Sequence, residues 1–378
     1  MSIYILPARV QVLSLPPSQR ASLTHAIAKN VFFPPRRDTF FSYTENPSEI
    51  SIVAEVATVE RDFRAVSSCP ASQFIIEPDV LRVLEIDAAV GLDNAGQRII
   101  DVSAPLARAG ISIFYLSTYQ TDYVLVKERR LWQVVQTLQE HGFTFADLDT
   151  VEIPAESPSA LLPSAPLFVT NDDYTVDADG EADRLAALAS GGAPTQTADS
   201  QAQVMADMRS RCPKTVLSHH LSMVGLNRDH KDAWAMQVLQ LLFYPELSKH
   251  TRSGRRFVSY TVTGDGVSLV TDSEVLAEFD EHLINCSQTP TTLRLVQVQL
   301  ASLGYDRYGI VYSMSETLRS HGINLLYLST HDTANIIVND VDLSRTCETL
   351  GVNEERDVEQ NGNEYSHYGM PRQSMCAH

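Results

Sequence analysis

The sequence predicts an α+β protein built from four βαββαβ units, the ferredoxin-like arrangement, in two tandem halves. Two internal repeats predict this class. The run DVSAPLARAGISIFYLST at 101–118 returns as VYSMSETLRSHGINLLYLST at 311–330. The run FFSYTENPSEISIVAEV at 40–56 returns as FVSYTVTGDGVSLVTDSEV at 257–275. Because both repeats occur in the same order, the two halves share one internal plan.

The elements of each half follow from these repeats. The earlier run predicts a strand, a turn and a strand, preceded by a helix-like stretch that ends in aromatic residues, THAIAKNVFFP or AWAMQVLQLLFYP. The later run predicts an amphipathic helix closed by a glycine, Gly110 or Gly322, and then a strand. A polar turn, a second strand (YVLVK, NIIVN) and a second helix (RRLWQVVQTLQEHG, DLSRTCETLG) complete the plan.

The domain boundaries are placed where this pattern stops and starts. Between the halves the chain is rich in Ala, Ser, Pro, Gly and Asp without sustained periodicity, which predicts a flexible acidic linker. The predicted parts are a first unit (1–71), a second unit (72–153), the linker (154–211), a third unit (212–289), a fourth unit (290–351) and a disordered tail (352–378).

An antiparallel sheet with both helices on one face leaves its other face and its edges uncovered. The half-buried pattern of the predicted strands fits such a sheet. We therefore expect each unit to pair with a sister unit, and the predicted loops and turns to meet at the interface.

Composition restricts the class of protein. A 44% hydrophobic content indicates a globular chain, and a formal net charge of −18 disfavours binding to nucleic acid or to an anionic membrane. We expect no signal peptide and no membrane span. The five cysteines form no CxxC pair, which is typical of reduced thiols, so we expect a cytoplasmic protein.

Sequence motifs give no support for catalysis or for a metal. We find no P-loop, GxSxG or paired-carboxylate motif, so we predict that the chain is not an enzyme and holds no cofactor. His219, His220 and His230 lie close in sequence but lack ligand partners at metal-site spacing. The GDG at 264–266 predicts a hairpin turn rather than a nucleotide loop.

Glycine loops precede the repeated helices, with Gly91 and Gly96 in the first half and Gly304 and Gly309 in the second. Glycine permits close backbone approach, and a helix start offers free N–H groups suited to an anion such as an α-carboxylate. An interface pocket for an amino acid is one interpretation. The alternative is that the glycines only make turns.

The repeated runs carry a family resemblance. CPASQF at 69–74, IIDVSAPLARAGISIFYLSTYQTDYVLVKE at 99–128 and LGYDRYGIVYSMSETLRSHGINLLYLST at 303–330 resemble the CASTOR family of cytosolic arginine sensors. That resemblance implies four ACT domains, arginine bound between the second and fourth units, and a homodimer. It also implies that the unliganded protein binds and inhibits a GATOR complex upstream of the TOR kinase.

The resemblance also implies roles for particular residues. Ser112, Ile113, Gly304 and Thr330 match the ligand pocket. The turn that matches the GATOR contact comprises Tyr119, Gln120, Thr121 and Asp122.

Three positions depart from the family pattern. Arg307 stands where the family places an acidic residue, His331 where it places an aromatic residue, and Ala334 where it places a second acid, with Asp332 two positions earlier. A ligand guanidinium beside Arg307 would meet repulsion and unpaired donors. We include Arg307, His331 and Asp332 in the predicted ligand site. Instead of arginine, the site would bind an acidic or neutral amino acid, or Arg307 would fill it.

Three functions remain open from the sequence. The first is an amino-acid-binding regulator that controls a GATOR-type partner in TOR signalling. The second is an ACT scaffold without a ligand. The third is an ACT subunit that regulates an amino-acid biosynthetic enzyme in trans.

Overall fold

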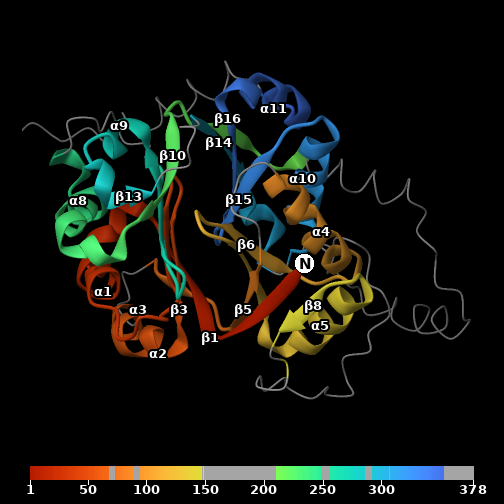
Figure 1. Ribbon diagram of the computed structural model, residues 1–378, viewed down its shortest axis with the longest axis horizontal. Coiled ribbons are helices and arrows are strands. Elements are labelled where there is room, and N and C mark those ends of the chain that lie inside the picture. Colours follow the sequence, from red (N-terminus) through yellow and green to blue (C-terminus); the bar gives the residue numbers. More distant parts are fainter. Residues whose placement is uncertain are drawn as a thin grey trace, which may run out of the picture.

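The computed structural model describes residues 1–67, 73–87, 94–146, 148, 210–247, 256–285, 292–305 and 307–352 (Figure 1). The predicted linker lies outside the described residues except for Ser210 and Arg211, and the predicted tail lies outside them except for Val352. Both predictions therefore stay predictions.

The first and third units share one element order. The first comprises β1 (Ser2–Leu15), α1 (Arg20–Phe32), β2 (Phe41–Glu45), β3 (Ile50–Glu55), a helical segment of α2 (Val56–Thr58), η2 (Val59–Phe63) and α3 (Arg64–Ser67), and β4 (Ile75–Ile76). The third comprises β10 (Leu221–Leu226), α8 (Lys231–Phe243), β11 (Val258–Val262), β12 (Val267–Asp272), α9 (Ser273–Leu276) and β13 (Ile284–Asn285). The GDG segment lies in the β11–β12 hairpin, as predicted, where the Thr263 N–H donates to the Gly266 carbonyl.

The second and fourth units follow the same plan. The second comprises β5 (Leu81–Ile86), α4 (Ala95–Arg108), β6 (Ile113–Ser117), β7 (Asp122–Lys127), α5 (Leu131–Glu140) and β8 (Thr144–Ala146). The fourth comprises β14 (Leu293–Gln299), α10 (Ile310–Ser320), β15 (Leu325–Ser329), β16 (Thr333–Asn339) and α11 (Leu343–Leu350). The predicted α+β class with two repeated halves is confirmed.

The units join edge to edge through their second strands. In the first and third units β2 pairs with β11 antiparallel, and Ser42 and Thr44 hydroxyls contact those of Thr261 and Ser259 at 2.8 and 2.9 Å. In the second and fourth units β6 meets β15, with Leu116 opposite Leu328. Each pairing removes an open sheet edge, as the sequence predicts.

The described strands form one continuous hydrogen-bonded sheet, and β1 joins the part made by the first and third units to the part made by the second and fourth. Its last residues, from Val10, pair with β3 of the first unit, whereas Ser2–Ile5 pair with β5 and β8 of the second. The second half divides this task between two strands. β10 lies mainly in the third unit and meets β14 of the fourth unit at Leu221–Leu293, whereas β9 (Lys214–Val216) pairs with β14 alone. The sequence does not predict this exchange, and the exact domain boundaries stay predictions.

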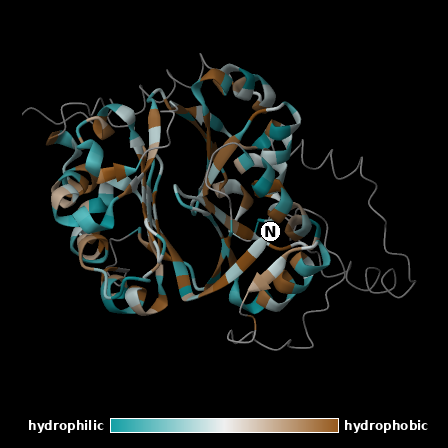
Figure 2. Cartoon of the chain, viewed as in Figure 1, coloured by the Kyte–Doolittle hydropathy of each residue, from teal (hydrophilic) through white to brown (hydrophobic). Residues whose placement is uncertain are grey.

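The two joined sheets lie face to face with helices on the outside (Figure 1). A central hydrophobic cluster, including Val12, Leu125, Leu295 and Ile337, fills the space between the sheets. Apolar residues are concentrated along the strands, and the outer helices alternate apolar and polar residues (Figure 2). The face that each unit leaves without helices is thus buried against the opposite sheet.

In the described part of the chain, no helix combines the length and the apolar character that crossing a membrane requires.

Replacing Ile3 tests the shared strand. Ile3 is fully buried in the core of the second and fourth units, whereas the adjacent Tyr4 is 39% exposed. We expect Ile3→Ala to lower the apparent free energy of unfolding by about 2 to 5 kcal/mol, measured in urea. Tyr4→Ala is the control and should cost much less. Equal losses for the two variants would show that Ser2–Ile5 is not held in this sheet.

Candidate functional site

A small cavity lies at the interface between the second and fourth units. The second unit contributes Ser112 and Ile113 at the start of β6. The fourth contributes Arg307, Gly309 and Thr330, from the loop before α10 and the turn after β15. The cavity measures about 30 Å³, which is room for a few water molecules and not for an amino acid. The structure thus brings together residues that the sequence places in both halves.

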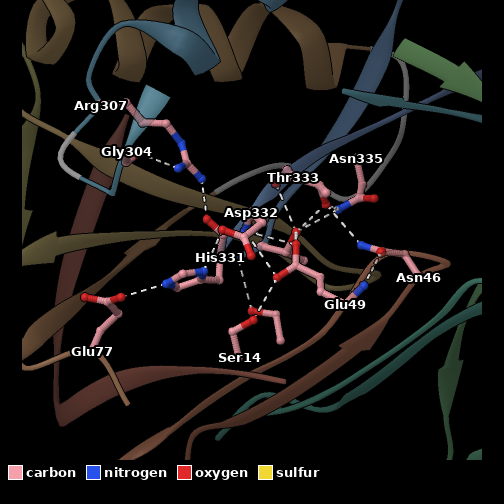
Figure 3. A network of polar contacts seen from close by, with 12 residues as sticks. Ser14, Asn46, Glu49, Glu77, Gly304, Arg307, His331, Asp332, Thr333 and Asn335 are labelled. Atoms are coloured by element: carbon pink, nitrogen blue, oxygen red, sulfur yellow. Dashed lines mark hydrogen bonds and ion pairs between the residues drawn. The ribbon is translucent and has the colours of Figure 1, made fainter. Parts of the chain in front are cut away.

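The Arg307 side chain lies at this cavity. Its Nη1 donates to the Gly304 carbonyl at 2.5 Å, and its Nη2 donates to the His331 carbonyl (Figure 3). Burial lowers the pKa of Arg307, although Tyr327, Asp332 and Glu49 oppose that effect. Gly304 has φ of +72°, a conformation that favours glycine and turns the chain toward Arg307.

The start of α10 differs from the equivalent start of α4. Gly309 is the residue before α10 and has φ of +79°. As a glycine it provides no side chain to cap the helix start. In the other half, the Gly96 N–H donates to the Asn324 side-chain oxygen at 2.9 Å. Asn324 is the repeat of Ser112. One helix start therefore donates to a side chain of the sister unit, while the other faces the cavity.

The turn after β15 docks on the first unit. The buried carboxylate of Glu49 accepts from Thr330 Oγ1 at 2.7 Å and from the Asp332 N–H at 3.0 Å (Figure 3). Ser14 donates to the other Glu49 oxygen at 3.3 Å. Burial raises the pKa of Glu49, and the hydrogen bond from Thr330 opposes that rise. One carboxylate thus fixes the turn that forms a wall of the cavity.

His331 connects this turn to the second unit. Its Nδ1 lies 2.8 Å from Asp332 Oδ1, and its Nε2 lies 2.6 Å from Glu77 Oε1. Its ring stacks on Tyr305 with centroids 5.4 Å apart. Burial by itself lowers the pKa of His331, but the hydrogen bonds with the two carboxylates outweigh it and raise that pKa.

Ligating atoms of Glu49, His331 and Asp332 lie within 4.8 Å of one another. The hydrogen bonds within the turn account for this cluster, so we assign no metal to it. The histidines considered from the sequence do not converge on one point: His219 contacts Asp272 at 3.0 Å, and the ring of His230 meets that of His282 edge to face.

The equivalent turn in the first half docks on the third unit. The Tyr119 N–H donates to Ser268 Oγ at 3.0 Å, and Gln120 Nε2 donates to the Val267 carbonyl at 3.3 Å. The Tyr119 ring packs over Gly225, where an added Cβ would lie 2.7 Å from ring carbon Cδ1. The predicted partner-contact turn is therefore held against its own chain.

Asp122 is buried, whereas Tyr119 and Gln120 of the same turn are partly exposed. It is 1% exposed and forms an ion pair with Arg98 at 3.1 Å. Burial raises the pKa of Asp122, and the positive charge of Arg98 opposes that rise. Thr121 also turns inward, because its hydroxyl donates to the Ile86 carbonyl at 2.6 Å.

The two docked turns share one contact that was not predicted from the sequence: a backbone N–H of each turn donates to a serine hydroxyl. The His331 N–H donates to Ser51 Oγ, just as the Tyr119 N–H donates to Ser268 Oγ. The repeated pair FFSYTENPSEIS and FVSYTVTGDGVS contains both serines, so the repeat held a signal for this contact. The same pair places Glu49 opposite Gly266, so the turns and their docking surfaces diverge together. Glu77 and Tyr305 lie outside the repeated runs, so the repeats gave no signal for their contacts with His331.

Comparison with known proteins agrees with this architecture. The ACT domain family model matches residues 77–140 and 288–351. The fold and its paired units thus define an ACT-domain protein. "Putative protein CASTOR3P" of Homo sapiens is 35% identical over 126 residues, which cover 32% of this chain and 73% of that protein. The chain belongs to the CASTOR family.

Longer relatives cover almost the whole chain. "Cytosolic arginine sensor for mTORC1 subunit 1" of Homo sapiens is 26% identical over 93% of this chain and 97% of its own length. The protein of the same name from Rattus norvegicus is 25% identical over 93% and 96%. Among solved structures, aspartate kinase from Synechocystis aligns with a TM-score of 0.31 and 10% identity, over 92% of this chain and 54% of that one. A TM-score this low supports no functional conclusion.

Gly225→Ala tests the docking of the first turn. The new methyl group would clash with the Tyr119 ring, and such overpacking costs about 1–3 kcal/mol. We expect the Tyr119 amide to exchange with deuterium about tenfold faster or more, because its bond to Ser268 opens more often. Gly264→Ala is the matched control, since an added Cβ there has no neighbour within 4 Å. Unchanged exchange in Gly225→Ala would contradict the docked arrangement.

Proposed function

We propose that this chain is a non-catalytic regulator in TOR signalling that acts by binding a GATOR-type partner. The supporting observation is the polar cavity between the second and fourth units of a chain that belongs to the CASTOR family. Relatives over nearly the full length are named as sensors for mTORC1. A trans-acting subunit of a biosynthetic enzyme is less well supported, because those relatives are named as sensors.

The regulatory element is the wall of the cavity. It comprises the loop before α10 and the turn after β15, and the turn is also bonded to Glu49 of the first unit. An occupant that binds more tightly to one arrangement of this wall shifts the chain toward it. Because the turn touches two units, occupancy changes the packing between them.

Arginine is not the effector of this chain in our proposal. The Arg307 guanidinium already lies at the cavity, so a second guanidinium there would be repelled. Ala334, on β16, is fully buried and offers a methyl group and no carboxylate. The site therefore offers little free space to an arginine side chain, and the nearby carboxylates of Glu49 and Asp332 already face Arg307.

Calorimetric titration of the wild-type chain with L-arginine measures this directly. We expect no saturable heat, because Arg307 keeps the cavity cationic and small. Saturable binding of arginine in the micromolar range would contradict the exclusion. Titration with the remaining amino acids separates a changed effector, acidic or neutral, from a scaffold that binds none.

The partner-contact surface in this proposal is the turn Tyr119–Asp122. Tyr119→Ala should reduce recovery of GATOR-type subunits by about tenfold or more, because aromatic side chains dominate many interfaces. Immunoprecipitation from host cells with mass spectrometry measures this recovery. Tyr244→Ala is the control, since Tyr244 is 45% exposed on the third unit. Equal recovery from both variants would remove Tyr119 from the partner surface.

Asp122 is unsuitable for the same experiment. Removing its carboxylate would leave Arg98 without that buried partner, which costs about 3–5 kcal/mol when a buried pair is broken. Lost recovery would then report a damaged fold. The homodimer that the family resemblance implies also stays a proposal.

A further inference from the structure

The guanidinium of Arg307 is bound in an unusual way for a largely buried charge. Among the described residues its hydrogen-bond acceptors are two backbone carbonyls, those of Gly304 and His331. Glu49 and Asp332 lie near enough to favour its positive charge, but neither is hydrogen-bonded to it. A guanidinium fits such a site because its N–H groups point outward in one plane, toward separate acceptors.

The two acceptors come from different segments of the fourth unit. Gly304 lies in the loop before α10, and His331 lies in the turn after β15. Arg307 therefore holds loop and turn together, and the turn is further bonded to Glu49 and Ser51 of the first unit. The contact that closes the cavity is thus made by a side chain of the protein itself.

We propose that Arg307 is a built-in ligand: its guanidinium occupies the position that a free guanidinium compound would take in this site. The regulatory consequence rests on the proposed function, whereas the binding itself does not. With Arg307 in place, the wall of the cavity stays in its closed arrangement whatever the concentration of free amino acids. The partner contact of this chain then does not respond to the supply of free amino acids.

Covalent attachment explains why a free compound does not displace Arg307. An attached group acts at an effective concentration of about millimolar or more, so a competitor of similar intrinsic affinity has to exceed that level. The acceptors are backbone carbonyls and survive any substitution at position 307. Removing the side chain takes the Arg307 donors away from both part-buried carbonyls, and a free guanidinium would replace those donors.

The test compares Arg307→Ala with the wild-type chain by isothermal calorimetry and thermal unfolding. We expect Arg307→Ala to bind L-arginine or methylguanidinium at least about tenfold more tightly than the wild type, and to unfold at a higher temperature when either is present. L-citrulline, the neutral analogue of arginine, should not reproduce the effect. Arg345→Ala is the matched control, because Arg345 also donates to a backbone carbonyl, that of His321, but on the exposed surface.

Several outcomes would overturn the built-in ligand. A folded Arg307→Ala that binds neither compound would do so, as would equal gains from L-citrulline or in Arg345→Ala. If Arg307→Ala folds only when L-arginine is supplied, that rescue supports the proposal. If it never folds, the wild type decides: binding of any free amino acid at the cavity contradicts the proposal, and absence of binding supports it. Failure of wild-type partner recovery would count against the proposed function alone.

Discussion

The need to cover one bare sheet face per unit determines most of this structure. Each unit places its helices on one side, so its other face and its outer edge are apolar and unpaired until a second unit meets them. Edge pairing through β2–β11 and β6–β15 makes two broad sheets, and their bare faces then bury one another around the central cluster. The interface cavity exists because these units are forced together there.

The internal repeat produces two equivalent helix starts, those of α4 and α10, and the side chains around them differ. At the start of α4, the side-chain oxygen of Asn324 from the sister unit accepts a hydrogen bond from the Gly96 N–H. At the start of α10, Ser112 stands in the equivalent place and the cavity remains, with Arg307 at its wall. The docking surfaces differ in the same way, since Glu49 binds one turn where Gly266 accommodates the other. Duplication supplied two similar sites, and substitution of a few side chains separated them.

The repeats were enough to predict the class, the number of units and their pairing, because strand and helix periodicity is local. The family resemblance, not the repeats, placed Ser112, Arg307 and Thr330 at one interface. The role of Glu49 could not be predicted, because it lies 281 positions from Thr330 and belongs to another unit. Periodicity shows that a strand has a buried face, but not which strand lies beside it. For that reason the shared strand β1 was not foreseen, although Arg307 filling its own pocket was one stated alternative.

The strand exchange at the start of each half has a consequence for synthesis on the ribosome. Residues Ser2–Ile5 emerge before β5 and β8, and β9 emerges before β14 and an entire unit ahead of it. Until those later strands leave the exit tunnel, the early strands carry unpaired backbone groups on apolar segments, a template for pairing with another nascent chain. The first half alone still leaves the edges of β2 and β6 unpaired, because their partners β11 and β15 lie in the second half. Chaperone dependence and aggregation should therefore follow the length of the growing chain, with full relief only when the second half is complete.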